Sequence, residues 1–478
     1  VVSFDIKSLY PSIMTSLNIS HESKIGKIED GNKILMAGVG GKVLKFETDE
    51  DLIDWVKDKG YCISGAGVIF DQSFEGVVTK FISKQFTNKS YFEQCIKRAI
   101  KDGDTELVRM YERKRSITKI FVNSGYGILS TGSSPFYDLD LARSITLTGQ
   151  NVIKKAHELV TRLSEKKFNT TERVVVASDT DSCMLDLTEV CANIGKLGIN
   201  MFDEEGKLSK DGGKLCDLYG KLLNTKVNDW AKSSMNCNEP TFFFEREKCC
   251  SAALFFGKKQ YAYYVNNNDG YDLPPHKRMK YTGLKVIKSE YSPMVKDMMN
   301  KIYHETLSKY QELGKNKTRY LLSGIVKSHK DDFYSADFFS VSKRQKANNF
   351  IKYEINGDIT KAYPDRPEDF SGNKKKNWEY KVRAVTELFR KTPMAVYPSR
   401  TPAQVKSCIN HNRLVEKLGL KAKYPLHSGG VKSMWVYVKP NKWGFDSIAG
   451  NNGRLPPEFE LEIDYDKQFE KLYLPVYE

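Results

Sequence analysis

Acidic side chains stand at the ends of strand-like runs that lie far apart in this 478-residue sequence. Asp5 closes the β-branched run VVSFDI, and Asp179 and Asp181 lie at the tip of the hairpin predicted from RVVVASDTDSCMLDL. Glu245 and Glu247 alternate along a later strand-like run, and residues two apart on a strand share one face. The pattern predicts a sheet in which three strands bring these acids together.

Such grouped acids have two interpretations. Acids in turns are usually solvated turn formers, and DTDS taken alone fits that description. Adjacent carboxylates, however, repel and raise each other's pKa unless a cation lies between them. Mg²⁺ takes a few carboxylate oxygens together with water and substrate phosphates. Two such ions roughly 3.5 to 4 Å apart activate an attacking hydroxyl and stabilise a leaving oxygen, so the second interpretation predicts phosphoryl transfer.

The helix predicted for KIFVNSGYG carries three functional side chains on one face. Lys119, Asn123 and Tyr126 stand at positions i, i+4 and i+7. A lysine here would neutralise charge on a triphosphate, and the tyrosine would pack under a base pair. The alternative is an ordinary helix with Tyr126 in the core and Lys119 in solvent.

The periodicity of the remaining chain predicts a mixture of helices and strands. Helical spacing from about residue 76 to 128, with a polar break at residues 101–104, predicts two helices folded back on each other. A further helix is expected at about 138–165, and a strand pair in TFFFEREKCCSAALFF and KKQYAYYV. From about Tyr291 the chain becomes helical, basic and loop-rich, and no chemistry is assigned to residues 26–75.

The composition favours a polyanionic partner. Lys and Arg outnumber Asp and Glu by 75 to 60, which gives a net charge of +15 and makes nucleic acid the first candidate. No apolar run approaches the ~20 residues of a membrane-spanning helix. The nine cysteines contain no CxxC pair, so neither a zinc site nor a secreted disulfide framework is indicated, and we expect a cytoplasmic location. Val1 opens directly into a strand-like run, which predicts neither a signal peptide nor a native start.

Four motifs stand in the order found in family B DNA polymerases, and the sequence resembles that family over essentially its whole length. The motifs are SLYPS after Asp5, K-x-x-x-N-S-x-Y-G from Lys119, DTDS from Asp179, and GKKQY from Gly257. KYTGLKVIKS and KANNFIKY look most like the replicative polymerases of T-even-type bacteriophages. The resemblance covers the polymerase half of such enzymes.

That resemblance implies an α/β (α+β) right-hand architecture. Its palm would hold the β-sheet, its fingers would be a helical hairpin and its thumb would be mainly helical. The implied ranges are palm at 1–75 and 131–290, fingers at 76–130, and thumb at 291–478.

The resemblance also implies a two-metal site. Asp5 and Asp181 would bind two Mg²⁺ ions, for which Mn²⁺ is a possible substitute, and the Ile6 carbonyl would be a further ligand. Asp179 would be a nearby acid of smaller effect. The accessory carboxylates beside the metals would be Glu245 and Glu247.

For the incoming nucleotide, the resemblance implies contacts from the first helix and from the fingers. Ser8 and Leu9 would offer backbone N–H groups to the triphosphate, and Tyr10 would exclude a 2′-hydroxyl. The family also uses an Arg and a Lys one helical turn apart in the fingers. Lys89 best fits the Arg position, but its partner would be Glu93, and Lys84 is the alternative.

Basic residues toward the C-terminus would contact DNA. The implied set, together with one aromatic residue, is Lys258, Lys259, Tyr261, Lys288, Lys343, Arg344 and Lys346. Backbone contacts of this kind are independent of sequence and sensitive to salt. The Lys374–Lys376 run is assigned no site. The sequence departs from the family pattern at Ala177-Ser178, before Asp179, and at Gly125 in the fingers. These departures bear on the efficiency of DNA synthesis and not on the type of reaction.

The expected function is template-directed DNA synthesis, with primer–template DNA and deoxynucleoside triphosphates as partners. No second constellation of acids for a proofreading exonuclease is found, so the chain is expected to be one piece of a split polymerase or a truncated product. A separate exonuclease chain and a sliding clamp are possible partners. The alternatives are a weak or inactive nucleic-acid-binding subunit of a split replicase, and protein-primed synthesis.

Overall fold

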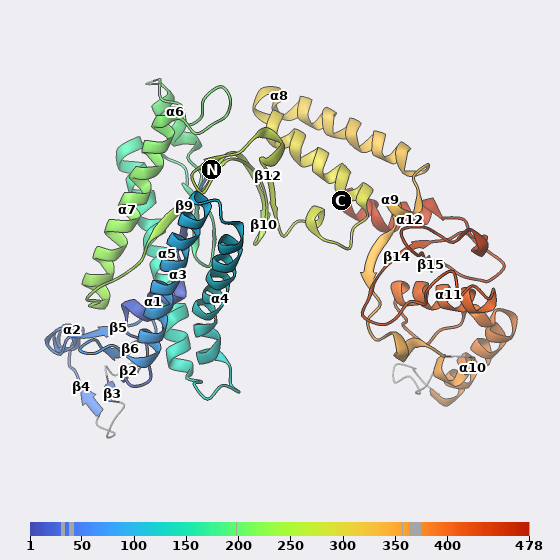
Figure 1. Ribbon diagram of the computed structural model, residues 1–478, viewed down its shortest axis with the longest axis horizontal. Coiled ribbons are helices and arrows are strands. Elements are labelled where there is room, and N and C mark those ends of the chain that lie inside the picture. Colours follow the sequence, from blue (N-terminus) through green and yellow to red (C-terminus); the bar gives the residue numbers. More distant parts are fainter. Residues whose placement is uncertain (30–33, 38–42, 197, 356, 363–373, 478) are drawn as a thin grey trace. The chain divides into compact units, whose positions relative to one another are not determined.

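The computed structural model describes residues 1–29, 34–37, 43–196, 198–355, 357–362 and 374–477, which form two compact units (Figure 1). Unit 1 comprises Val1–Ala253 with Val265–Arg278, and unit 2 comprises Leu254–Tyr264 with Met279–Glu478. Helices and strands are mixed in both units, which confirms the predicted α/β class. In the described part of the chain, no helix has the length and apolar character needed to cross a membrane.

Strand β1 (Val2–Ile6) is central to the sheet of unit 1. It pairs in antiparallel fashion with β8 (Ser182–Leu185) on one side and with β9 (Phe244–Gly257) on the other. β8 also pairs with β7 (Val175–Asp179), so the hairpin predicted around DTDS is confirmed. β9 is followed by β10 (Gln260–Asn268), and both strands contribute residues to both units.

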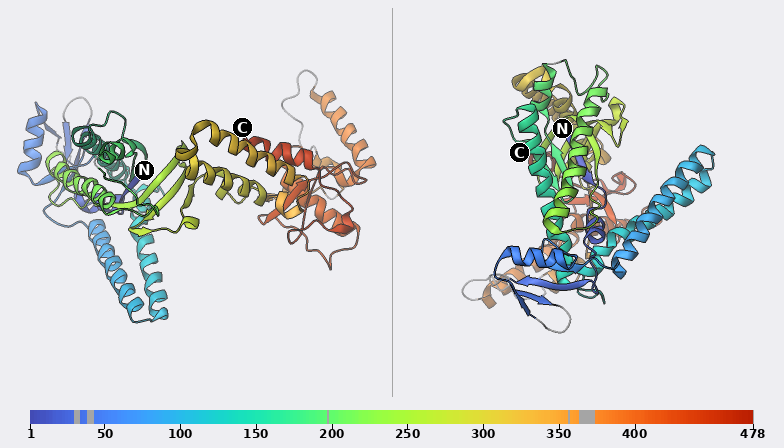
Figure 2. Two further views of the ribbon diagram at one scale, coloured as in Figure 1. Left: turned by 90° about the horizontal axis from the view of Figure 1, so that it is seen from above. Right: turned by 90° about the vertical axis from the view of Figure 1, so that its left-hand side faces the viewer.

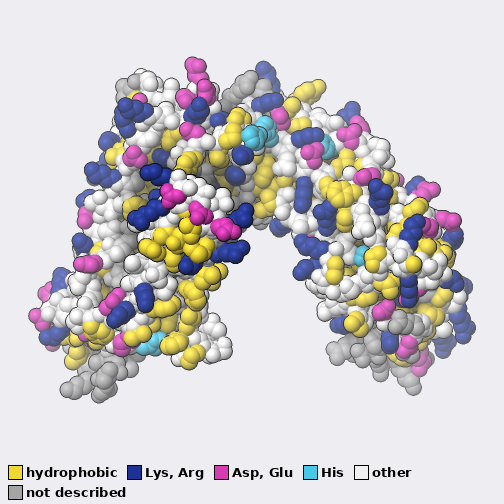
Figure 3. Space-filling model, in the orientation of Figure 1, with side chains coloured by type: hydrophobic (Ala, Val, Ile, Leu, Met, Phe, Trp, Pro, Cys, Tyr) yellow, Lys and Arg dark blue, Asp and Glu magenta, His cyan; other side chains and the backbone are white. Residues whose placement is uncertain are grey.

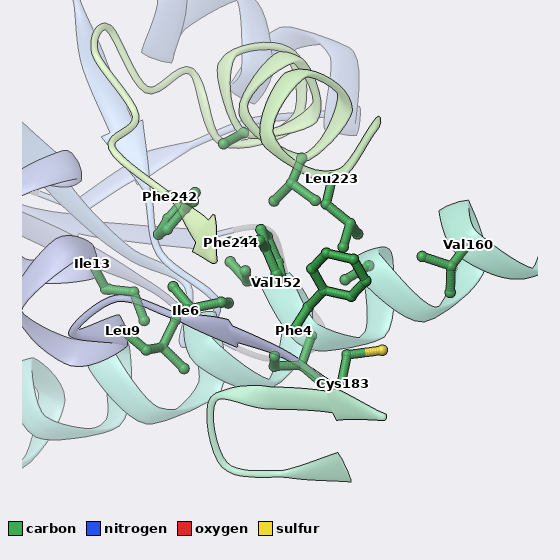
Figure 4. Close-up of a cluster of buried hydrophobic side chains, with 14 of the residues drawn as sticks. Phe4, Ile6, Leu9, Ile13, Val152, Val160, Cys183, Leu223, Phe242 and Phe244 are labelled. Carbon is green, nitrogen blue, oxygen red and sulfur yellow. The ribbon is translucent and has the colours of Figure 1, made fainter. Parts of the chain in front are cut away.

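Alternation along β1 separates a core face from a face that carries the acid. Phe4 and Ile6 are almost fully buried, and Figure 4 shows them among the apolar side chains of the surrounding helices. Because successive side chains on a strand point to opposite faces, Asp5 lies on the other side of the sheet. Burying each such apolar side chain contributes about 1.5–3 kcal/mol, which anchors the strand that carries Asp5. The core that buries Phe4 and Ile6 includes residues of α1 (Leu9–Ser16), α5 (Leu139–Phe168), α6 (Thr188–Gly195) and α7 (Lys210–Met235).

The predicted helical hairpin is confirmed. Helix α3 (Val77–Lys101) and helix α4 (Thr105–Ser130) lie side by side and project from the rest of unit 1 (Figure 2). Gly103 turns the chain with a φ of +73°, a conformation that glycine adopts without a steric penalty. Asp104 then caps α4, because its carboxylate accepts the backbone N–H of Leu107 at 2.9 Å.

Close packing explains why the hairpin carries Gly125. A Cβ atom at this position would lie 3.0 Å from Cδ1 of Ile82 on α3 and 3.5 Å from Cε of Met14 on α1. A side chain at this position would therefore be placed tightly against both of them. Gly125 also lines a pocket of about 310 Å³ between α3 and α4.

A second antiparallel sheet follows α1 in the chain, in a region for which the sequence predicted no chemistry. Lys24 on its strand β2 forms ion pairs with Asp138 and Asp140 at 3.1 and 3.0 Å, which tie this sheet to the start of α5. Its elements are β2 (Lys24–Glu29), β3 (Ile34–Ala37), β4 (Val43–Lys45), α2 (Asp49–Asp58), β5 (Tyr61–Ile63) and β6 (Val68–Asp71).

Unit 2 is mainly helical and also holds a small sheet, which the sequence did not predict. Strand β13 pairs with β14, and β14 with β15, in antiparallel fashion. Its elements are β12 (Met279–Thr282), α8 (Pro293–Phe333), α9 (Phe338–Val341), β13 (Lys343–Lys346), α10 (Lys374–Lys391), α11 (Ala403–Lys417), β14 (Lys432–Tyr437), β15 (Ser447–Ala449), α12 (Tyr465–Leu472) and α13 (Leu474–Tyr477). The short strand β11 (Tyr271–Asp272) belongs to unit 1.

Candidate active site

The two acids that the sequence placed on different strands meet at the end of the central sheet. Asp5 on β1 lies opposite Ser182 on β8 and opposite Glu245 on β9. The Ile6 backbone N–H donates to the carbonyl of Asp181 at 2.9 Å, which joins the end of β1 to the β7–β8 turn. The side chains of Asp5 and Asp181 are hydrogen-bonded to each other. The sheet register therefore brings together acids that are 176 positions apart.

Burial and mutual repulsion perturb both carboxyl groups. The pKa of Asp5 rises from 3.8 to about 7, first because the group is partly buried and then because Asp181 and Glu247 lie nearby. The pKa of Asp181 is raised as well, mainly by burial, with a further contribution from the charge of Asp179. Both carboxyl groups are therefore protonated more readily than ordinary aspartates, and their hydrogen bond forms when one of the two holds a proton.

A strand irregularity decides which glutamate joins this pair. The pairing of β1 with β9 shifts register between Ser3 and Phe4, which is the signature of a β-bulge. Glu247 lies at that bulge, and its charge raises the pKa of both aspartates. Lys248 pairs with Glu247 and opposes the rise at Asp5. Glu245 faces Asp5 across the strands but is exposed.

Two of the predicted acids have the chemistry that a divalent cation needs. Among the described residues, no group of three or more His, Cys, Asp or Glu side chains has the arrangement of a metal site. Asp5 and Asp181 nevertheless offer the oxygen donors that Mg²⁺ prefers. Their hydrogen bond and raised pKa values mark a position where a positive charge would relieve repulsion.

The predicted sugar-gate residue meets the helical hairpin. The rings of Tyr10 on α1 and Tyr126 on α4 have centroids 5.0 Å apart and are tilted by 55°. Burial raises the pKa of Tyr10, and the nearby Tyr126 and Asp181 raise it further. Ser8, with a φ of 56°, precedes the first turn of α1, where backbone N–H groups have no intrahelical acceptor. Leu9 begins that turn, so its N–H is one of these groups.

Several cations gather beside the hairpin. Burial lowers the pKa of Lys89, the neighbouring Glu93 opposes this effect, and Lys7, Lys119 and Arg115 lower it further. The sequence predicted Lys89 and Lys119 as residues of the hairpin that bind the nucleotide. It did not predict that Lys7, just after β1, and Arg115 on α4 would lie within electrostatic reach of Lys89 as well.

Other predicted residues of the hairpin lie apart from this cluster or at its edge. Lys84 is exposed on α3 and is not among the groups that perturb Lys89. Asn123 is exposed on the same face of α4 as Lys119. Sequence reasoning missed Arg115, although its place one helical turn before Lys119 was a usable signal. It also missed Lys7, which carried no signal beyond following β1.

The predicted DNA-contacting residues of GKKQY differ in exposure. Lys258 and Lys259 are exposed in the turn between β9 and β10. Tyr261 is only 4% exposed, its ring packs edge-on against Phe255 with centroids 5.3 Å apart, and its hydroxyl accepts the backbone N–H of Lys259 at 2.9 Å. Tyr261 therefore positions the turn. Lys288 is exposed further along the chain.

A second basic group lies on the sheet of unit 2. β13 carries the predicted Lys343, Arg344 and Lys346. The Arg344 guanidinium lies over an aromatic ring at 4.8 Å from its centroid. The pKa of Lys296 on α8 is lowered, first by burial and then by Arg344 and Lys432. Lys432 faces Lys346 directly across the strand pair, so like charges are grouped here as well.

Comparison with known proteins confirms the resemblance. A sequence profile described as "DNA polymerase family B" matches residues 1–201, which include Asp5, Lys119 and Asp181. The chain is 24% identical over 421 residues to the DNA-directed DNA polymerase of Enterobacteria phage T4, covering 75% of this chain and 43% of that protein. It is 29% identical over 206 residues to the DNA polymerase zeta catalytic subunit of Saccharomyces cerevisiae, covering 42% of this chain and 13% of that protein. A match at 24% identity to the DNA polymerase alpha catalytic subunit of Mus musculus covers 44% of this chain and 12% of that protein. The chain thus spans less than half the length of each of these relatives.

Proposed function

We propose that this relative of the family B DNA polymerases is a DNA-directed DNA polymerase that adds deoxynucleotides to a primer 3′-hydroxyl. The observation that carries the proposal is the meeting of Asp5 with Asp181 at the end of the sheet, next to Tyr10 and the hairpin that carries Lys119. A protein that only binds DNA has no need of two carboxylates held in contact at the cost of their mutual repulsion.

In this proposal, Asp5 and Asp181 hold divalent cations, Mg²⁺ or in substitution Mn²⁺, with the Ile6 carbonyl as a further ligand. Cations held there would neutralise phosphate charge and favour the deprotonated form of the attacking hydroxyl. Glu247 adds negative charge from the β9 bulge, and Asp179 adds it from the β7–β8 turn.

The nucleotide is positioned by α1 and by the hairpin. Backbone N–H groups at Ser8 and Leu9, at the start of α1, donate to phosphate oxygens, as helix N-termini commonly do. Lys119 and Lys89 neutralise the triphosphate. Tyr10, supported by the ring of Tyr126, packs under the deoxyribose and excludes a 2′-hydroxyl.

In the same proposal, unit 1 holds the palm and the α3–α4 fingers, and unit 2 holds the thumb. Lys258, Lys259 and Lys288 bind backbone phosphates of the primer–template duplex, together with the basic residues of β13. Figure 3 shows Lys and Arg side chains at many places on the visible face, interspersed with acids, so position rather than a uniform field must select the DNA path. The proposed partners are primer–template DNA and deoxynucleoside triphosphates in the cytoplasm. Co-elution of this chain with a candidate protein would test whether it binds a separate exonuclease chain or a sliding clamp.

Primer extension on a DNA template with Mg²⁺ tests the function. The wild-type chain should extend the primer, and Asp181→Asn should reduce extension by at least 100-fold because the cation loses a charged ligand. The matched control is Glu165→Gln, an exposed acid on α5, which should retain wild-type extension. A wild-type chain that binds the duplex but extends no primer would favour the binding subunit instead.

A further inference from the structure

Helix α3 begins without a cap of its own. Its N-cap residue is Gly76, which has no side chain to accept the free N–H groups of the first helical turn. Side chains of the segment 18–23, which follows α1, accept these N–H groups from 55 to 58 positions earlier in the chain. We call this segment the α3 socket. The direction of α3 therefore depends on a segment at the end of α1 and not on the hairpin alone.

Three successive N–H groups of α3 are each accepted by one side chain of the α3 socket. The donor and acceptor pairs are Gly76 with Oδ1 of Asn18 at 2.9 Å, Val77 with Oε1 of Glu22, and Val78 with Oγ of Ser20 at 3.2 Å. The hydroxyl of Ser20 also donates to Oε2 of Glu22 at 2.7 Å, which joins two of the three acceptors. Because hydrogen bonds are directional, three of them from consecutive residues fix the orientation of the helix end as well as its position.

The α3 socket is joined to α1 and to the segment before α3. The backbone N–H of Ile19 donates to the carbonyl of Met14 at 2.9 Å, so the socket continues from the last turn of α1. The side-chain amide of Asn18 donates to the carbonyls of Asp71 and Phe74 at 2.6 and 2.7 Å. Asn18 is almost fully buried, and hydrogen bonds satisfy both ends of its side chain.

The close approach of Gly76 to the α3 socket requires glycine. A Cβ atom on Gly76 would lie 2.5 Å from Cβ of Ser20 and 3.0 Å from its hydroxyl oxygen. Ser20 is fully buried, so its Cβ cannot move aside without disturbing the packing around it. The N-cap therefore lacks a side chain because the socket occupies that space, and the socket supplies the hydrogen-bond acceptors instead.

Glu22 adds a charge to these hydrogen bonds. Its carboxylate lies at the N-terminus of a 25-residue helix, where the aligned peptide dipoles favour a negative charge. Slight burial raises the pKa of Glu22, but the hydrogen bonds from Val77 and Ser20 outweigh this effect and leave the pKa below its ordinary value. Hydrogen bonds to an ionised acceptor are stronger than neutral ones. Glu22 is exposed, in contrast to Asn18 and Ser20, so it can be replaced without opening a cavity in the core.

The length of α3 amplifies any change of direction at the α3 socket. Lys89 lies 12 positions after Val77, which is about 18 Å along the helix axis. A rotation of roughly 10° about the socket would move Lys89 by roughly 3 Å and the turn at Gly103 by roughly 7 Å. A displacement of about 1 Å in a group that positions a substrate costs about 100-fold in rate. The hydrogen bonds at the start of α3 therefore bear on the placement of residues far along the helix.

We propose that Asn18, Ser20 and Glu22 are positioning residues that fix the direction of α3 relative to α1. Tyr10 lies at the start of α1 on one side of this joint, and Lys89 lies on α3 on the other. The inference rests on the proposed function, in which these three residues have no role. They act through α3 and are not catalytic residues.

Steady-state primer extension by the full chain with Glu22→Ala tests the positioning role. The matched control is Glu75→Ala, which removes an exposed acid next to Gly76 that accepts none of the three N–H groups. Glu22→Ala should raise the KM for deoxynucleotides about fivefold, the factor expected when a capping hydrogen bond is lost. Saturating nucleotide should restore the wild-type kcat because it selects the correctly directed hairpin. Glu75→Ala should keep the wild-type KM, and Glu22→Gln, which retains the acceptor Oε1, should stay within about twofold of it.

A role limited to stability has a different signature. Partial unfolding would lower the kcat through loss of active protein and would leave the KM unchanged. The buried side chains of Val122 and Leu129 on α4 anchor the hairpin in every variant, so all four proteins should fold. Their affinities for primer–template DNA should be equal.

A distance measurement without substrate separates this inference from the proposed function. Nitroxides attached through unnatural amino acids at Asp102, in the hairpin turn, and at Lys166, on α5, report the direction of the hairpin by pulsed electron paramagnetic resonance. Glu22→Ala should broaden the distance distribution by roughly 5 Å relative to the wild type, and Glu75→Ala should leave it unchanged. A wild-type chain that shows this dependence on Glu22 but extends no primer would refute the polymerase proposal and leave the positioning of the hairpin supported. Equal KM values or equal widths in the two alanine variants would overturn the positioning role.

Discussion

Replacing Asp5 with Asn should stabilise the metal-free protein while it abolishes activity. The folded-state pKa of Asp5 is about 7 and its ordinary value is 3.8, so the folded protein holds this proton more tightly than the unfolded chain. The contribution of Asp5 to the unfolding free energy therefore falls as the pH rises from about 3.8 to about 7 and then levels off. Asn has no charge to lose, and its amide still donates to Asp181.

The magnitude follows from the size of the shift. About three pKa units at roughly 1.4 kcal/mol each set an upper limit of roughly 4 kcal/mol. Because Asp5 is only about half buried, solvent screening reduces this to roughly 1–2 kcal/mol. Above pH 7.5, unit 1 of Asp5→Asn should therefore unfold about 2–4 °C higher than that of the wild type. Below pH 4 the two proteins should unfold at the same temperature.

Thermal unfolding in EDTA at pH 4, 6 and 8 measures this difference, with Glu165→Gln as the control that should follow the wild type at each pH. Added Mg²⁺ should raise the unfolding temperature of the wild type more than that of Asp5→Asn, since only the wild type keeps both carboxylates. A difference between Asp5→Asn and the wild type that is independent of pH, or a less stable Asp5→Asn at pH 8, would refute the electrostatic argument.

Two further outcomes are expected. Tyr10→Ala should raise the ratio of ribonucleotide to deoxynucleotide incorporation at least tenfold in primer extension because the steric block is removed, and an unchanged ratio would remove Tyr10 from that role. The double substitution Lys343→Gln and Lys346→Gln should weaken primer–template binding and reduce the salt dependence of its logarithm by about two units, one for each phosphate contact, whereas an unchanged salt slope would place the DNA elsewhere.

The local pattern of residues was enough to predict many elements. The alternation in VVSFDI predicts a strand with one buried face, and the structure buries Phe4 and Ile6 while leaving Asp5 on the other side. The polar break before Gly103 predicts the α3–α4 hairpin. These features depend on near neighbours in the chain, so periodicity and turn chemistry encode them directly.

Which residues lie together at the candidate site depends instead on contacts between distant segments of the chain. The bulge in the β1–β9 pairing brings the charge of Glu247 close to the aspartates, whereas Glu245 is exposed. The alternation of the two glutamates along the strand does not reveal this difference. The packing of α3 on α4 places Lys119 and Arg115 within electrostatic reach of Lys89, whereas Lys84 is not among the groups that perturb the pKa of Lys89. Tyr261 is buried by its aromatic neighbours despite standing in a basic motif. Strand register and helix packing follow from the burial of whole faces, and no single segment of sequence carries that information.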